Sequence, residues 1–573
     1  MVTNKYITRI ASVIMAAAVI LCLMASLFSD KLQEVYGNNA VTMKYESKLF
    51  STDQIMDIDI LMDEDDWNNM LENAISEEYY SCNVVVNGKT FYSVGIRPKG
   101  NTSLSSIAND PDTDRYSFKL EFDHYIEGQT CYGLDKLILN NNYADATNMK
   151  EAIVYDMYQY LGVDASLYNY AKISVNGDYR GVYLALEAVE DSFMLRNYGT
   201  EDGNLYKPES MGIGGGVDGN GFPQKGEMPD GEDFPQKGEM PDGEDFPQKD
   251  EMPDGEDFPQ MGEAPNGEAA DIKMGIMGGN GGSDLNYTDD DLDSYSTIWD
   301  GEITDTDKKD HKRVVEALKN ISEGTDLETY MDVDNILKYM AVHTFVVNDD
   351  SLSGIMAHNY YLYEYNGKLN ILPWDYNLSF GGMSMGGKMG GQSLGATSVI
   401  NDAIDTPFSI TDFFDALLEN EEYLEQYHGY LNELVEKYVN GGEFEKTYER
   451  IRSQIDDLVG NDPTAFYSYE EYEEAANMLI EVVQLRAKSV SGQLAGTIPS
   501  TDEGQQQDSS NLIDGSDIDL SVMGSFSGGG GGNEGQGKDN GFAGTPQPFD
   551  AGDVSPISEE KADLQDSNQD SVK

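Results

Sequence analysis

The stretch "HNYYLYEYNGKLNILPWDYNLSFGG", residues 358–382, decides how the second half of this chain is interpreted. It predicts a hairpin of two strands, because an Asn-Gly pair between two alternating apolar runs is a strong local signal for a tight turn. Asp375 follows the second strand, directly after Pro-Trp, and Asn359 opens the first strand. A structural turn would explain Asp375, but it would not explain Asn359, because Asn is depleted in strands. The pair therefore indicates a functional site at the open end of the hairpin.

The segments around this hairpin predict a mainly helical half of the protein, residues 310–495. Apolar residues recur there at helical spacing. His343 lies inside one of the apolar runs and is predicted to be a core or interface residue. Five amphipathic helices are expected, in residues 312–321, 333–347, 414–439, 444–459 and 469–494.

Residues 42–208 predict a strand-rich half. In residues 116–122 large apolar side chains alternate with polar ones, which indicates a strand with one buried face. Lys119 belongs to the polar set and is expected on the opposite face. Two Asn-Gly hairpin turns and one long helix are also expected, at residues 87–88, 176–177 and 148–162.

Two further segments are predicted to be disordered. Residues 209–309 form an acidic insert that contains four copies of a twelve-residue unit, "FPQKGEMPDGED", between residues 222 and about 269. Residues 496–573 form a tail rich in Ser, Gly, Asp and Gln. Proline, glycine and acidic residues at this density cannot bury enough apolar surface to fold. The sequence therefore predicts two folded halves separated by an extended acidic loop.

The chain has 573 residues and a formal net charge of −67, from 104 acidic and 37 basic residues. This charge argues against nucleic acid as a partner, since proteins that bind nucleic acid present basic surfaces. Residues 10–28 form an apolar run about long enough to cross a bilayer, preceded by Lys5 and Arg9. These basic residues favour a cytoplasmic N-terminus, residues 1–9, and an outward-facing remainder after a linker, residues 29–41. We expect an uncleaved membrane anchor, with a cleaved signal peptide as the alternative.

The candidate chemical groups occur in an order typical of phosphoryl transfer. That reaction needs a lysine for nucleotide phosphates, an acid that fixes the lysine, and oxygen ligands for magnesium. Lys119, Glu151, Asp350, Asn359 and Asp375 follow one another as the strand lysine, helix glutamate, catalytic Asp, Asn and metal-binding Asp do in protein kinases. Asp375 is thus expected to meet a metal ion that Asn359 also reaches. The common kinase motifs are absent: no G-x-G-x-x-G precedes Lys119, and V-A-I-K, H-R-D and D-F-G do not occur.

Six stretches carry a resemblance to a known family: "GIRPKGNTS" (95–103), "FKLEFD" (118–123), "LDKLILNNNYADATNMKEAIVYDMYQYLG" (134–162), "KISVNGDYRGVYLALEAVEDSFMLRNYG" (172–199), "GNLYKPE" (203–209) and the hairpin stretch quoted above. Together they resemble the CotH kinase family of bacterial spore-coat-type proteins. The resemblance implies an α+β, atypical two-lobed protein-kinase-like fold, with a strand-rich N-lobe over 42–208 and a mainly helical C-lobe over 310–495. It also implies transfer of phosphate from ATP, with magnesium, to Ser or Thr of surface or coat proteins.

By position, the resemblance implies roles for individual residues. Lys119 would be the phosphate-binding lysine and Glu151 its helix partner, while Asp350 would be the catalytic acid and Asp375 the metal ligand of a Trp-Asp motif. Many relatives carry a second acid two places after the Trp-Asp acid, whereas Asn377 stands there in this chain. An amide oxygen can bind magnesium but with less charge, so a weaker metal affinity is expected.

Several of these assignments have alternatives. Glu151 stands three residues after an Asn and also fits a capping box at the start of a helix. Asp349 is adjacent to Asp350, and either acid could be the base. Arg97 and Lys99, in "RPKGN", are further candidates for binding nucleotide phosphate, with a surface turn as the alternative.

We therefore expect a membrane-anchored CotH-like kinase whose catalytic part faces outside the cytoplasm, at a cell surface or spore coat. Its partners would be ATP, magnesium and an acceptor protein rich in Ser and Thr. The first alternative is a non-catalytic surface or coat protein that binds partners through its fold and acidic repeats. The second is a hydrolytic enzyme with a metal site, but the five histidines form no H-x-H or H-E-x-x-H pattern.

Overall fold

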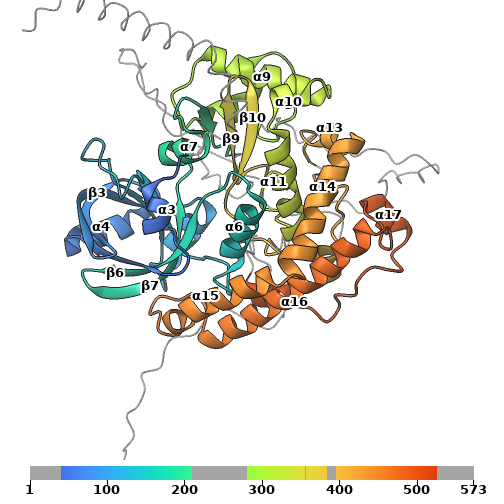
Figure 1. The fold of residues 1–573 in the computed structure, drawn as a ribbon. Coiled ribbons are helices and arrows are strands. Elements are labelled where there is room, and N and C mark those ends of the chain that lie inside the picture. Colours follow the sequence, from blue (N-terminus) through green and yellow to red (C-terminus); the bar gives the residue numbers. More distant parts are fainter. Residues whose placement is uncertain (1–40, 210–280, 355, 384–394, 409, 525–573) are drawn as a thin grey trace, which may run out of the picture. The chain divides into compact units, whose positions relative to one another are not determined.

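The N-terminal strands form a closed barrel. The structure is a computed structural model that describes residues 41–209, 281–354, 356–383, 395–408 and 410–524. Seven strands follow the order β1-β2-β3-β4-β5-β7-β6 around the barrel. Figure 1 labels β3, β6 and β7 among them. They are β1 (Met56–Leu61), β2 (Tyr80–Val86), β3 (Lys89–Lys99), β4 (Ser117–Glu121), β5 (Lys136–Asn140), β6 (Tyr168–Val175) and β7 (Asp178–Glu187). Short helices accompany them: α3 (Lys44–Lys48), α4 (Glu64–Glu72), η1 (Ala74–Ser76), α5 (Thr102–Ala108) and α7 (Asp191–Tyr198).

The predicted two-lobed, protein-kinase-like fold was wrong. The mixed α+β content is as predicted, but the strand-rich half is a closed barrel and not a kinase-like lobe. Closure occurs at β1, which pairs antiparallel with β2 and parallel with β6. The parallel pair runs from Met56 opposite Ala171 to Ile60 opposite Val175. Because this pairing joins strands far apart in the chain, no local pattern in the sequence announces it.

Strand β4 shows how the barrel separates its two faces. Phe118 and Leu120 are buried in the cluster inside the barrel, together with Leu139 of β5. Ser117 and Lys119 alternate with them and therefore point outward. The alternation predicted from the sequence is confirmed, and the outward face of β3, β4 and β5 becomes the wall on which the candidate site is built.

A second, three-stranded sheet joins the two halves of the chain. Its order is β10-β9-β8, with β8 (Asn204–Tyr206), β9 (Tyr360–Tyr365) and β10 (Lys368–Pro373). The predicted hairpin is confirmed: β9 and β10 pair antiparallel around Asn366 and Gly367, whose φ angles of +55° and +86° are those of a tight Asn-Gly turn. The other Asn-Gly turns, at residues 87–88 and 176–177, are confirmed in the same way.

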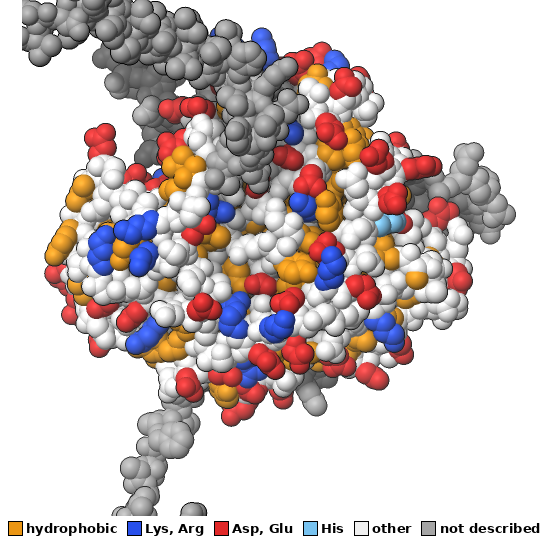
Figure 2. All heavy atoms as spheres, in the orientation of Figure 1, with side chains coloured by type: hydrophobic (Ala, Val, Ile, Leu, Met, Phe, Trp, Pro, Cys, Tyr) orange, Lys and Arg blue, Asp and Glu red, His pale blue; other side chains and the backbone are white. Residues whose placement is uncertain are grey.

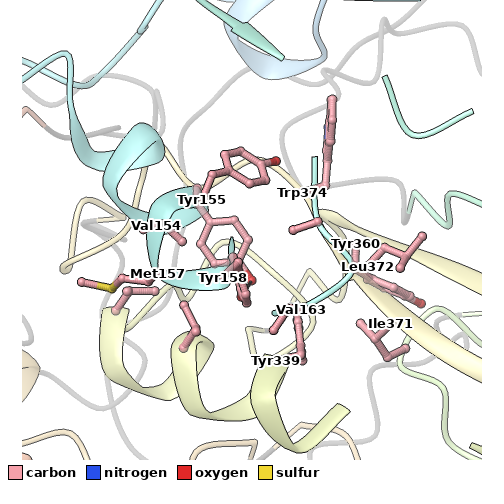
Figure 3. Packing of buried hydrophobic residues seen from close by; sticks show 14 of the residues in the cluster. Val154, Tyr155, Met157, Tyr158, Val163, Tyr339, Tyr360, Ile371, Leu372 and Trp374 are labelled. Atoms are coloured by element: carbon pink, nitrogen blue, oxygen red, sulfur yellow. Dashed lines mark hydrogen bonds between the residues drawn. The ribbon is translucent and has the colours of Figure 1, made fainter. Parts of the chain in front are cut away.

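Helices pack around this sheet to form the larger core. Figure 3 shows Tyr155 and Tyr158 extending from α6 (Lys150–Leu161) into the space between α11 (Val333–Val346) and the hairpin. The ring of Tyr158 stacks on that of Tyr339 of α11 at 6.0 Å. The other helices of this half are η2 (Leu292–Tyr295), α8 (Ser296–Asp300), α9 (Lys308–Ser322), α10 (Leu327–Tyr330), α12 (Ala396–Ile400), α13 (Asp415–Leu418), α14 (Glu421–Glu433), the π-helical η3 (Leu434–Val439), α15 (Glu443–Gly460) and α16 (Tyr469–Leu494).

Both segments that were predicted to be disordered contain ordered residues at one end. Residues 281–309 contain η2 and α8, and Ser283 accepts a hydrogen bond from Tyr360 of β9 at 2.6 Å. Residues 496–524 contain α17 (Asp502–Gln507) and η4 (Leu520–Met523), and Met523 is buried. The overall composition of these stretches predicts disorder, but a few of their apolar residues, such as Met523, pack on the core.

The predicted membrane anchor, residues 10–28, and the acidic repeats, residues 222–269, lie outside the described residues. Within the described residues, no helix is both long enough and apolar enough to span a bilayer. On the face seen in Figure 2, acidic side chains are spread between Lys and Arg side chains. This face reflects the acidic composition of the whole chain.

Candidate functional site

The open end of the hairpin brings together the two residues that the sequence singled out. Tyr360 and Pro373 are paired across β9 and β10, so Asn359, before β9, and Asp375, after β10, leave the sheet at the same end. Both have left-handed backbones, with φ angles of +56° and +61°. Such conformations are uncommon outside glycine and gather at functional sites. The hairpin thus aims two oxygen-bearing side chains into one region.

Asp350 lies beside this pair and is held by two neighbours. His358 contributes Nε2 at 2.7 Å from Asp350 Oδ1. Asn359 donates its amide nitrogen to the backbone oxygen of Asp350 at 2.7 Å and to Oδ2 at 3.1 Å. Asp349 is exposed, and these contacts are made by Asp350. The structure therefore brings Asp350 to Asn359, and His358, the first residue of the opening stretch, is a neighbour that sequence reasoning missed.

Glu151 reaches the site from the first turn of α6. Asp145 accepts from the backbone nitrogens of Thr147 at 2.9 Å and Lys150 at 3.0 Å, so Asp145 performs the capping role. The Glu151 side chain instead accepts a hydrogen bond from Asn140 at 2.6 Å, and Asn140 is the last residue of β5. Glu151 therefore faces the barrel wall and does not close a capping box.

The two candidate lysines occupy different rows of that wall. In the register of β3 and β4, Lys99 is opposite Ser117, and Ser117 donates to Asn140, the partner of Glu151. Lys119 is one step away in the next row, and its Nζ lies 2.5 Å from Glu190. The structure thus pairs Lys119 with Glu190 and directs Lys99 towards Glu151.

Electrostatic interactions link Lys99, Glu151 and Asp375. Desolvation lowers the pKa of Lys99, while the negative charges of Asp375 and Glu151 act to raise it. Desolvation, followed by the charge of Asp375, raises the pKa of Glu151 to about 8. Desolvation also raises the pKa of Asp375, and Lys99 is the main group that opposes this shift. Three ionisable groups from distant segments therefore share one desolvated region, a recurrent feature of active sites.

Arg97, another predicted phosphate ligand, is occupied elsewhere. It forms an ion pair with Glu77 and donates to the backbone oxygen of Pro98 at 3.0 Å. Its guanidinium group also lies 5.5 Å from the centre of the Tyr79 ring. The geometry favours Lys99 over Arg97 as the cation of this site.

A buried polar network supports the site from behind. His343 is buried as predicted, and desolvation lowers its pKa to about 3. It hydrogen-bonds to the hydroxyl of Tyr376 at 3.0 Å and to Ser353 at 2.8 Å. Tyr376 also bonds to Tyr158 of α6 at 2.5 Å. Because Tyr376 follows Asp375 and Ser353 lies in the loop of Asp350, this network fixes the two loops relative to α6 and α11.

The residues present fit a magnesium ion held partly by a phosphate ligand. No described residue donates a hydrogen bond to the Asp375 carboxylate, and the side-chain oxygen of buried Asn348, whose nitrogen lies 3.4 Å from the Asp375 backbone oxygen, has no hydrogen-bond partner. Across the described parts of the chain, no three His, Cys, Asp or Glu side chains gather into a metal-binding group. Magnesium commonly uses one or two carboxylates and completes its shell with water and substrate phosphates. Asp375 with the amide oxygen of Asn359 matches that pattern.

Comparison with known proteins identifies the family. The family described as CotH kinase protein matches residues 96–490, which include both the barrel wall with Lys99 and the hairpin with Asp375. No curated protein matches the chain. Since the match covers well over half of the 573 residues, the chain belongs to the CotH kinase protein family.

Proposed function

We propose that this protein is a protein kinase that transfers the γ-phosphate of ATP to Ser or Thr hydroxyls of surface or coat proteins. The observation that supports this best is the mutual electrostatic influence of Lys99, Glu151 and Asp375 in one desolvated region. A desolvated ammonium group close to a carboxylate to which no described residue donates a hydrogen bond is suited to bind a phosphate chain and its metal ion. The family and the order of these groups along the chain support the same reaction.

In this proposal Lys99, in place of Lys119, contacts the nucleotide phosphates. Glu151 faces the same region from α6 and stabilises the positive charge of the Lys99 ammonium group. This stabilisation requires the ionised carboxylate, so it strengthens as the pH rises towards the raised pKa of Glu151. The binding of a phosphate chain with its metal ion would add positive charge near Glu151 and favour its ionised form.

Asp350 accepts the proton of the acceptor hydroxyl. The hydroxyl oxygen forms a bond to the γ-phosphorus while the bond from that phosphorus to the ADP oxygen breaks and ADP leaves. The hydrogen bonds from His358 and Asn359 hold the Asp350 carboxylate in one orientation. A carboxylate has about four lone-pair positions, so two such bonds leave room for the hydroxyl. Magnesium, held by Asp375 and Asn359, would supply positive charge to the transferring phosphoryl group.

The test is transfer of labelled phosphate from ATP by the full chain, with magnesium and dephosphorylated casein as a Ser-rich acceptor. Asp350→Asn and Asp375→Asn should each lower the rate by about 10³-fold, since each removes a charge used in the reaction. Asn tolerates the left-handed backbone at position 375, so the fold is preserved. Phosphate incorporation that is equal in the parent and both variants would refute the assignment of the site.

The proposed location is a membrane surface, with the catalytic part outside the cytoplasm. It rests on the apolar run of residues 10–28 and the preceding basic residues. Fractionation of cells that express the full chain should place it in the membrane pellet, and protease added to intact cells should remove residues after the run. The alternative of a non-catalytic surface protein would be favoured if the purified chain neither bound ATP nor transferred phosphate.

A further inference from the structure

A second lysine, which neither the predicted motif order nor the proposed roles use, lies close to Lys99. Lys207 follows strand β8 in the three-stranded sheet. Lys99 and Lys207 lie over two aromatic rings that contact each other, Trp374 and Tyr361, and Trp374 directly precedes Asp375 in the chain. Two cations from separate segments therefore lie beside the end of the hairpin that leads into Asp375.

Two adjacent aromatic rings fix the positions of these lysines. Lys99 Nζ lies 5.6 Å from the centre of the Trp374 ring, and Lys207 Nζ lies 6.0 Å from that of Tyr361. The two rings contact each other edge to face at 5.4 Å. Trp374 and Tyr361 are both buried at the end of the hairpin, so the two ammonium groups lie beside one rigid pair of perpendicular rings.

Lys207 is at present paired with an exposed residue close to it in the chain. Its Nζ lies 2.5 Å from Glu209. Desolvation acts to raise the pKa of Glu209, but Lys207, His358 and Lys99 together lower it below its usual value. The Glu209 carboxylate is therefore stabilised by two lysines and by a histidine that becomes positively charged when it is protonated. The site attracts an anion, and Glu209 is the anion that the chain itself supplies.

We infer that Lys99 and Lys207 form a clamp for two neighbouring phosphates of a polyphosphate chain, and that Glu209 occupies Lys207 until the phosphate displaces it. This deepens the proposed function and rests on it for the identity of the natural ligand, ATP. The ligand class itself, a linear di- or triphosphate, follows from the two lysines and the metal-binding Asp375. Glu209 itself is exposed and lies two residues from Lys207, so its side chain can rotate aside and leave Lys207 free for the phosphate.

The clamp is tested by calorimetric binding of inorganic tripolyphosphate, ATP and AMP to the full chain with magnesium. Lys207→Met should weaken tripolyphosphate and ATP by at least about tenfold, the loss expected for a hydrogen bond to a charged group. Binding of AMP, which has a single phosphate, should change by less than about threefold. Glu209→Gln should tighten tripolyphosphate and ATP a few-fold, because the competing carboxylate charge is removed.

The matched control is Lys338→Met. Lys338 resembles Lys207 in its contacts, with an ion pair to Asp334 at 2.7 Å and an ammonium group 5.6 Å from the ring of Tyr430, but it lies on α11 and not among the residues that act on Asp375. This variant should bind all three ligands as the parent does. An equal loss in Lys338→Met and Lys207→Met would mean a general charge effect and would overturn the clamp.

The other outcomes separate the clamp from the kinase proposal. Unchanged ATP binding by Lys207→Met, in a parent that transfers phosphate, overturns the clamp alone. A parent that binds tripolyphosphate through Lys207 but neither binds ATP nor transfers its phosphate supports the clamp and refutes the kinase. Weaker binding by Glu209→Gln would show that Glu209 helps to hold the ligand, contrary to its role as a displaceable anion. A parent that binds none of the ligands overturns both proposals.

Discussion

Two charged clusters beside the outward face of the barrel behave in opposite ways: a closed cluster of Lys119, Lys136 and Glu190, and an open cluster of Lys99, Glu151 and Asp375. In the first, Lys119 and Lys136 both contact Glu190, at 2.5 and 2.7 Å, and although desolvation opposes it, the two lysines lower the pKa of Glu190. In the second, desolvation dominates. It lowers the pKa of Lys99 and raises the pKa of Asp375, so that it favours the neutral form of each group. Charges that are paired with each other within the protein stabilise the fold, whereas charges that lack a close ionic partner are suited to bind a charged ligand.

The two clusters differ because Lys99 and Lys119 occupy neighbouring positions on the same face of the paired strands β3 and β4, two residues apart along the strands. Lys119 is opposite Arg97, while Lys99 is opposite Ser117, one row nearer to Asn140 and Glu151. Side chains in adjacent rows of a sheet are several ångströms apart, which is enough to exchange one set of partners for another. The predictions below disturb one cluster or the other.

The largest expected effect is that of Asp375→Asn on the open cluster. The rate of phosphate transfer should fall by about 10³-fold, because the variant removes the negative charge that the metal ion requires. The thermal midpoint of the ligand-free protein should fall little or rise, since a desolvated carboxylate with a raised pKa is replaced by a neutral amide. Transfer assays and thermal unfolding of the same preparations measure both.

The matched control is Asp290→Asn, which makes the same change of charge at another position. Asp290 is largely exposed and pairs with Lys319 at the surface, so neither rate nor thermal midpoint should change measurably. A large loss of activity in this control, or none in Asp375→Asn, would contradict the distinction between the clusters.

Glu151→Gln should alter the pH dependence of stability. In the unfolded chain a glutamate ionises near pH 4.5, whereas in the folded protein desolvation and Asp375 raise the pKa of Glu151 to about 8. Between these values the unfolded state loses a proton that the folded state keeps, so Glu151 makes the protein less stable as the pH rises. Glutamine does not ionise, so the variant lacks this pH-dependent loss of stability. It should be more stable than the parent at pH 8 by roughly 1–3 kcal/mol.

Urea unfolding at pH 5 and pH 8 measures this difference. At pH 5 the parent and Glu151→Gln should differ less than at pH 8. If the difference in the free energy of unfolding were the same at both values, Glu151 would not be the desolvated acid described here.

The smallest effect is expected in the closed cluster. Lys119→Met leaves Glu190 with Lys136 as its ionic partner and should lower the free energy of unfolding by about 1–2 kcal/mol. Lys437→Met, which removes an exposed pair with Glu433, should cost less than about 0.5 kcal/mol. Equal costs in the two variants would show that the closed cluster does not stabilise the fold.

The hairpin and its two polar residues could be predicted from sequence because their signals are local. An Asn-Gly turn between alternating strands sets the register of β9 and β10, and this register places Asn359 and Asp375 at one end. The same reasoning gave the outward direction of Lys119 in β4. In each case the structure depends on residues within a few positions of one another.

The pairing of Lys119 with Glu190 and the closure of the barrel could not be predicted, because both join segments that are distant in the chain. Alternation in β4 shows that Lys119 points outward, but it does not show which outward row faces α6. The parallel pairing of β1 with β6 likewise joins distant segments. Lys207 and His358 were missed for a related reason, since each acts through neighbours from other elements and neither belongs to a general kinase motif.

The most direct test of the account is ATP binding by Lys99→Met and Lys119→Met, measured by calorimetry on the full chain with magnesium. Lys99→Met should weaken ATP binding by at least about tenfold, because it removes a charge that contacts phosphate. Lys119→Met should bind ATP within about threefold of the parent, since its charge is already used by Glu190. The reverse result, with Lys119 required and Lys99 dispensable, would contradict the assignment of the open cluster as the nucleotide site.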